Sequence, residues 1–294
     1  MATLTLLLEE REPHLLCLGG SSVSERRNPM SDTDLFAIGP ADGQDRFRRL
    51  AGLFPKADLE WRPAAWLDAI APALERFSPD IATGPSPFAY ADLRFLARIV
   101  LGVRLAERGG LGARVADLRE PLRRALAAYM STYYVNTYED VLGLYRAGRH
   151  RDVLPLAGEL AQRAALLGLL QVRLAEPASK WALGIARTGG PPGLSAAAER
   201  MLAHLGAFAA GRPSAWAAGL LQRANALVAA GMIAALGPET GAADLAGQPR
   251  PSEGLCLMGA PGYLTLIDLD RSQVSVCNRA FLALYADEAA PAFA

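Results

Sequence analysis

The stretch from Leu15 to Ile38 constrains the fold more than any other part of this sequence. An apolar run over residues 15–18 ends abruptly at Gly19-Gly20-Ser21-Ser22, and after a polar segment Ser31-Asp32-Thr33-Asp34 leads into a second apolar run. Apolar runs this short, bounded by glycine and polar residues, predict two buried strands with a glycine–serine turn after the first. We expect the strands over residues 14–18 and from Asp32 or Thr33 to Gly39.

Two carboxylates stand at the start of the second expected strand. Because side chains alternate along a strand, Asp32 and Asp34 point to the same side of it. Two carboxylates on one side can hold a hard divalent cation such as Mg²⁺, which prefers oxygen ligands. The backbone amides of Gly20, Ser21 and Ser22 can bind a phosphate group. Together these features predict metal-assisted chemistry on a nucleoside triphosphate.

The surrounding residues predict a small α+β unit. Helical spacing of apolar residues predicts helices over 3–12, 43–54 and 64–77, and alternation over 57–62 predicts a half-buried strand. The order is therefore helix–strand–strand–helix–strand–helix. A segment rich in proline and glycine, 78–90, reads as a linker.

The chain after the linker is dominated by helical periodicity. We expect helices over residues 91–107, 115–133, 137–147, 152–176, 178–187, 194–210 and 214–236. The region 237–262 is rich in glycine and proline and is expected to be a loop. Residues 263–268 and 273–277 then predict a β-hairpin. The expected domains are 1–85, 86–240 (helical) and 241–294 (loop and hairpin extension).

Composition narrows the class of protein. With 294 residues, 51% of them hydrophobic, the chain is long enough for two domains with substantial cores. A formal net charge of zero counts against nucleic acid as a partner. Three scattered cysteines form neither a disulfide framework nor a zinc-binding pattern, which favours a reducing cytoplasm. We also expect no membrane segment, since no uncharged apolar run reaches about 18 residues.

A resemblance is carried by Gly20-Ser21, followed after ten residues by Asp32-x-Asp34 within Ser-Asp-x-Asp-Leu. This layout resembles the signature of the DNA polymerase β-like nucleotidyltransferase superfamily, and is most similar to bacterial aminoglycoside and other small-molecule nucleotidyltransferases. The match covers about residues 14–62, and it departs from the family pattern at Thr33, where an aliphatic residue is usual. It implies an α+β fold: a small catalytic domain with a mixed sheet, followed by a helical bundle.

The resemblance also implies a metal site with two Mg²⁺ ions. Asp32 and Asp34 would be metal ligands, and a third acidic residue would lie on a neighbouring strand. The sequence offers Asp58 and Glu60 on one face of the strand 57–62. Glu60 is preferred, because Leu-Glu followed by a bulky apolar residue is how the related drug-modifying enzymes present theirs. Glu60 would bind the metal, act as general base, or both.

The donor nucleotide, ATP or another NTP, would be bound by residues of the turn and its surroundings. Ser21 with the amides of Gly20 and Ser22 would hold the β- and γ-phosphates, and Arg26 would neutralise phosphate charge. Lys180, followed by an aromatic residue, resembles the element with which helical domains of template-independent nucleotidyltransferases reach the triphosphate. The alternatives are that Arg26 is a loop residue that aids solubility and that Lys180 is an ordinary surface residue.

The expected function is Mg²⁺-dependent transfer of an NMP, most simply AMP from ATP, onto a hydroxyl of a small-molecule acceptor, as in antibiotic modification. A monomer or homodimer is expected. Two alternatives remain: a tRNA or protein acceptor, as in toxin–antitoxin relatives, and a catalytically inactive member that binds nucleotide or a partner. Helical spacing of the tyrosines favours core packing over an acceptor pocket; these are Tyr129, Tyr133, Tyr134 and Tyr138.

Overall fold

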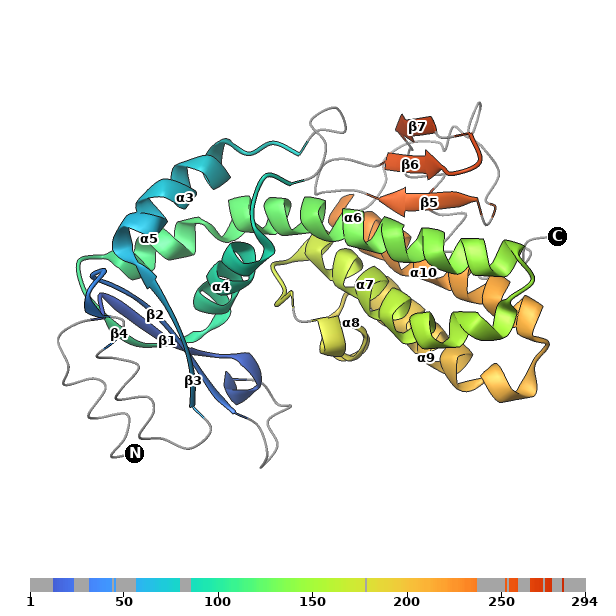
Figure 1. Cartoon of the computed structure of the whole chain (residues 1–294), viewed down its shortest axis with the longest axis horizontal. Helices are drawn as coiled ribbons and strands as arrows, with labels where there is room; N and C mark the ends of the chain where they lie inside the picture. The colour runs from blue at the N-terminus through green and yellow to red at the C-terminus, as the bar shows by residue number, and fades with distance from the viewer. Residues whose placement is uncertain are drawn as a thin grey trace. The chain divides into compact units, whose positions relative to one another are not determined.

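The computed structural model describes most of the chain (Figure 1). The described residues are 13–23, 32–43, 45, 57–79, 86–177, 179–236, 252, 254–258, 265–271, 273–276 and 282. Over these residues the chain is α+β, as expected, and mostly helical, with eight α-helices, a four-stranded mixed sheet and a three-stranded sheet. The predicted helix 3–12 and most of the predicted helix 43–54 lie outside them.

The chain divides into two compact units. The first comprises Met1–Ser78 and Pro87–Ala125, and the second comprises Pro79–Ser86 and Leu126–Ala294. Residues 87–125, which the predicted boundary at residue 85 places in the helical domain, therefore belong to the unit that contains the mixed sheet.

The sheet of the first unit has the strand order β3-β2-β1-β4. Its strands are β1 (Leu15–Gly19), β2 (Thr33–Gly39), β3 (Ala57–Pro63) and β4 (Val103–Glu107). β1 pairs antiparallel with β2 and β4, whereas β2 and β3 are parallel. The three strands predicted from the apolar runs and from alternation are confirmed to within about a residue.

One face of this sheet carries helices. The ring of Phe36 on β2 packs edge-on against Phe95 of α4 (Tyr90–Leu101), with ring centroids 5.9 Å apart. Trp66 of α3 (Ala64–Arg76) packs against the same Phe95 ring at 5.3 Å. α3 and α4 therefore cover the face that Phe36 shares with its neighbours at alternate positions, including Asp34. The other face carries a second apolar cluster: Leu16, Leu35, Ala37 and Trp61.

The helix predicted over 91–107 is wrong in its second half. α4 ends at Leu101, and Val103–Glu107 forms the edge strand β4 instead. A Cβ on Gly102 would lie 2.6 Å from the carbonyl oxygen of Arg98 and 2.7 Å from that of Leu18, so only glycine fits at this close approach. The chain leaves the helix there and pairs with β1. A shorter helix, α5 (Leu111–Asp117), follows.

The second unit is built mainly from helices. They are α6 (Arg119–Arg146, whose first residues belong to the first unit), α7 (Leu154–Val172), α8 (Ala182–Gly189), α9 (Pro192–Gly206) and α10 (Pro213–Leu236). Short 3₁₀ turns lie at His150–Val153, Ser179–Trp181 and Phe208–Ala210. The two separate helices predicted over 115–133 and 137–147 are wrong, since α6 is one continuous helix through both ranges. Asn136, between them, lies on the exposed side of α6, where its weak helix propensity is tolerated.

α7 and α10 pack with their backbones in contact. A Cβ on Gly231 would overlap the carbonyl oxygen of Gly168, and a Cβ on Gly168 would lie 2.7 Å from the carbonyl oxygen of Leu227. Two segments of the described residues, His150–Val172 and Pro213–Leu236, are long and apolar enough to cross a bilayer. In each, 61% of the most apolar window is buried within the protein, as expected of core helices.

A three-stranded sheet formed by β5 (Leu255–Met258), β6 (Thr265–Asp268) and β7 (Gln273–Val276) also belongs to this unit. The predicted hairpin is confirmed as β6 and β7. The loop predicted over 237–262 is wrong at Leu255–Met258, because β5 pairs with β6 on one edge and is bound by Asn225 of α10 on the other. The Asn225 side-chain amide donates to the carbonyl of Leu255, and its oxygen accepts from the N–H of Leu257.

Two of the four helical tyrosines complete this contact. Tyr134 donates a hydrogen bond to the Asn225 side-chain oxygen, and the Tyr138 hydroxyl accepts one from the Asn225 amide nitrogen. Both tyrosines are fully buried, so the core-packing interpretation is confirmed for them. Tyr133 differs, because 40% of its surface is exposed.

His204 joins α9 to α10. Its ring stacks on the ring of Trp216, and its Nε2 donates to the Trp216 carbonyl at 2.8 Å, because a carbonyl oxygen can only accept. Burial lowers the pKa of His204 below its usual 6.5; the hydrogen bond to Trp216 opposes this shift and Arg223 adds to it.

This lowered pKa predicts a pH-dependent stability. Below pH 6.5 the unfolded chain takes up a proton at His204 that the folded chain resists, so the free energy of unfolding should fall as the pH falls through this window. Urea unfolding at several pH values measures the slope. His204→Gln keeps a side-chain donor for the Trp216 carbonyl but does not titrate, and it should flatten the slope. An unchanged slope in this variant would show that other groups cause it.

Candidate functional site

The turn after β1 brings a glycine against an aspartate. Gly19 is the register partner of Asp34 in the antiparallel β1–β2 pair, and Gly20 follows with a φ of 61°. A Cβ built on Gly20 would overlap the Oδ2 atom of Asp34. The carboxylate of Asp34 therefore occupies the space beside the Cα of Gly20 that a side chain would fill. Glycine is needed there both for the left-handed backbone and for the close approach.

The acidic residues of β2 and β3 lie on one face of the sheet. Asp34 and Asp58 are register partners in the parallel β2–β3 pair, so their side chains leave adjacent strands, which are about 4.8 Å apart, on the same side. Asp58 is exposed and Asp34 is partly buried, while Asp32 is exposed just before β2 begins. Within the described ranges, no three His, Cys, Asp or Glu side chains lie close enough together to hold a metal ion.

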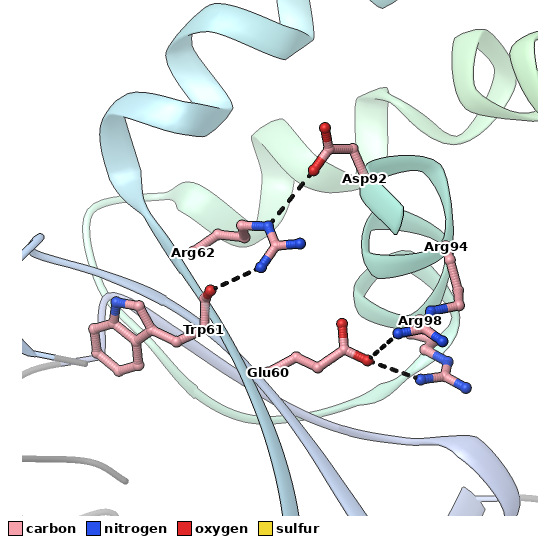
Figure 2. Close-up of polar contacts among 6 residues, drawn as sticks. All are labelled: Glu60, Trp61, Arg62, Asp92, Arg94 and Arg98. Atoms are coloured by element: carbon pink, nitrogen blue, oxygen red, sulfur yellow. Dashed lines mark hydrogen bonds and ion pairs between the residues drawn. The ribbon is translucent and has the colours of Figure 1, made fainter. Parts of the chain in front are cut away.

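Glu60 lies two residues further along β3 and is engaged by two arginines of α4. Its Oε1 atom accepts hydrogen bonds from Arg94 at 2.7 Å and from Arg98 at 3.1 Å (Figure 2). The Glu60 side chain is only 17% exposed and that of Arg98 14%, whereas that of Arg94 is 36% exposed. These ion pairs are partly shielded from water, so they hold Glu60 more firmly than a surface pair would.

A second ion pair between β3 and α4 lies two residues further along the strand. Arg62 forms an ion pair with Asp92 of α4 at 3.5 Å (Figure 2), and its guanidinium lies over the rings of Trp66 and Phe95. Trp66 also donates to Asp92 at 3.1 Å. Asp58, Glu60 and Arg62 alternate along β3, so their side chains lie on one face of the sheet. α4 supplies oppositely charged partners to Glu60 and Arg62.

The remaining predicted site residues are distributed differently. Ser21 and Ser22 belong to a 3₁₀ turn, Gly20–Val23, directly after β1. Arg26 lies outside the described residues. Lys180 lies in the second unit, in the turn Ser179–Trp181, where it is exposed and its Nζ atom is 5.9 Å from the centre of the Trp181 ring. Its role in phosphate binding stays a prediction.

A cavity of 260 Å³ lies between β1, the end of α4 and α5. Cys17 and Arg104 line it together with apolar residues. Burial raises the pKa of the Cys17 thiol to about 11, with Arg104 lowering it and Glu107 raising it. The thiol is therefore protonated at neutral pH and is not a nucleophile there.

The arginines of α4 are the functional candidates that the sequence patterns did not single out. Arg94 and Arg98 are four residues apart, so they share one side of a helix. The strand predicted at 57–62 presents two carboxylates on one face. Two arginines at helical spacing and two carboxylates at strand spacing are the sequence signal for an ion pair between a helix and a strand. The contact itself depends on how α4 packs against the sheet.

The sequence matches no protein-family model and no curated protein.

Proposed function

We propose that this protein is a Mg²⁺-dependent nucleotidyltransferase that moves an NMP, most simply AMP from ATP, onto a hydroxyl of a small-molecule acceptor. The observation that carries the proposal is the contact between Gly20 and the carboxylate of Asp34. It places the glycine–serine turn beside Asp34, one of the two paired aspartates, at the same end of the neighbouring strands β1 and β2.

The carboxylate oxygens of the aspartates on and beside β2 are ligands of the kind that Mg²⁺ prefers. This ion is commonly held by one or two protein carboxylates plus the phosphates of the substrate, so a complete protein cage is not required. We assign Asp32 and Asp34 as ligands. For the third carboxylate, the β2–β3 register supports Asp58 over Glu60, because Asp58 is opposite Asp34 while Glu60 is engaged by two arginines. Bound Mg²⁺ would supply charge stabilisation at the attacking and leaving oxygens.

The chain's own groups would complete the reaction. The acceptor hydroxyl attacks the α-phosphorus, the bond from that phosphorus to the bridging oxygen of the β-phosphate breaks, and pyrophosphate leaves. The amides after Gly19 would hold phosphate oxygens. A carboxylate of β3, Asp58 in this assignment, would accept the acceptor's proton. Small-molecule acceptors fit the zero net charge better than tRNA does.

Nucleotide binding tests the proposal. Calorimetry with each NTP should detect binding that requires Mg²⁺, and the double substitution of Asp34 and Asp58 by asparagine should weaken it by about 100-fold or more. Pyrophosphate release in the presence of candidate acceptors then tests catalysis. Asp68→Asn, at an exposed carboxylate paired with Arg114, is the matched control and should bind normally. A folded protein that binds no nucleotide would refute the proposal, and binding without pyrophosphate release would favour an inactive member.

A further inference from the structure

The cavity between β1, α4 and α5 has a buried apolar floor. Leu15, Ile99 and Val115 form this floor, and each is at most 3% exposed. Cys17 adds a protonated thiol, which behaves as a small apolar group. An apolar cavity of about 150 Å³ is large enough for benzene. At 260 Å³, this cavity has room for an apolar ligand of that size with a polar group attached.

The same cavity is also lined by a charged side chain, Arg104. Its side chain is 47% exposed, and its guanidinium packs against the Cα of Gly112, where a Cβ would overlap it. Its Nη1 atom donates to one carboxylate oxygen of Glu107, while the other accepts from the N–H of Gly112 at 2.8 Å. Over the residues that the structure describes, Nε and Nη2 of Arg104 have no hydrogen-bond partner. These two donors lie on one edge of the guanidinium, and such an edge matches the two oxygens of a carboxylate.

We propose that this cavity binds a small apolar carboxylic acid, with its hydrocarbon body on the apolar floor and its carboxylate on the Nε and Nη2 edge of Arg104. Glu107 is not part of the cavity lining, and both of its oxygens are engaged, so it offsets the charge of Arg104 without covering this edge. The affinity therefore comes from two hydrogen bonds and apolar contact. The inference does not depend on the proposed function, because neither Gly20 nor Asp34 lines the cavity.

Titration of the protein with benzoate, followed by NMR, tests the site. Benzoate has a flat apolar body and one carboxylate, and it should bind with a dissociation constant of about 1 mM or tighter. Acetate keeps the carboxylate but lacks the apolar body, so it should bind at least about tenfold more weakly. No binding of benzoate by the folded protein, or equal binding of acetate, would overturn the proposal.

A double substitution, Arg104→Met with Glu107→Gln, tests the two donors without changing the net charge beside the cavity. It should weaken benzoate binding by about tenfold, because both hydrogen bonds to the carboxylate are lost. Toluene, which has no carboxylate, should bind within about twofold of wild type and so show that the cavity is still folded. Arg114→Met with Asp68→Asn makes the same change in an exposed ion pair outside the cavity lining and should alter neither ligand. If benzoate binding survived the first pair of substitutions, or fell only as far as toluene binding did, Arg104 would not hold the carboxylate.

Alkylation of Cys17 shows where benzoate binds. Only the closed cavity binds the ligand, so about ten times the dissociation constant of benzoate should slow labelling of Cys17 about tenfold. Cys256 lies in the second unit and should keep its labelling rate. Binding of benzoate that left the labelling rate of Cys17 unchanged would place the ligand elsewhere and would refute the assignment of this cavity.

Discussion

Replacing Gly20 by alanine is expected to weaken Mg²⁺-dependent nucleotide binding by about 10- to 100-fold. The new methyl group would overlap Oδ2 of Asp34, so the carboxylate must move away from the position in which we propose it binds metal. The residue would also be held at a φ of 61°, which costs a non-glycine residue about 1–2 kcal/mol. Calorimetry measures the affinity, and urea unfolding measures the stability of the same variant.

Gly110→Ala is the matched control for this substitution. Gly110 has a similar φ of 69°, but a Cβ there would meet no atom within 4 Å. Gly110→Ala should lower only the stability, by the cost of a positive φ, and should bind nucleotide as the wild type does. Equal effects of the two substitutions on nucleotide affinity would mean that the contact between Gly20 and Asp34 has no functional role.

Replacing Asn225 by leucine is expected to lower the free energy of unfolding of the second unit by about 3–5 kcal/mol. The substitution removes four hydrogen bonds, to Tyr134, Tyr138, Leu255 and Leu257, and it leaves the buried N–H of Leu257 without its acceptor. Because these bonds bind the edge of β5, Leu255–Met258 should also become sensitive to protease. Urea unfolding and limited proteolysis measure the two effects.

Arg146→Ala is the matched control, because Arg146 binds the same sheet through an exposed ion pair with Asp270. Its loss should cost less than about 1 kcal/mol. Tyr138→Phe should lie between the two, at about 1 kcal/mol, since it removes only a hydroxyl. If Asn225→Leu were as mild as the control, β5 would be held by apolar packing and not by the Asn225 amide.

The parts of the fold that could be predicted are those specified by nearby residues. β1, β2 and β3 follow from apolar runs and alternation, and the long apolar helices follow from their period. β4 and β5 could not be predicted in this way. β4 is a strand because β1 is available beside it and Gly102 permits the close approach; β5 is a strand because Asn225, thirty residues earlier, satisfies its outer edge. Such tertiary contacts override local propensity.

In the candidate site, too, contacts between neighbouring parts of the sequence could be predicted and long-range contacts could not. Gly20 and Asp34 could be predicted to meet, because the two strands that carry them are sequence neighbours and pair directly. The partners of Glu60 could not, because Arg94 and Arg98 are more than thirty residues away on a helix whose packing face only the tertiary structure defines. The alternation of β3 indicated that Asp58 and Glu60 share a face but not which of them α4 would engage.

Cys17 and Cys256 are buried thiols on strands of different units. Burial raises the pKa of both, to about 11 for Cys17 and well above the ordinary range for Cys256, whose hydrogen bond with Tyr134 opposes the shift. The reactive thiolate is therefore scarce in the native protein. An alkylating reagent gains access to each thiol chiefly when its strand opens. The rates of alkylation at Cys17 and at Cys256 thus report the local opening of the two units separately, without an engineered cysteine.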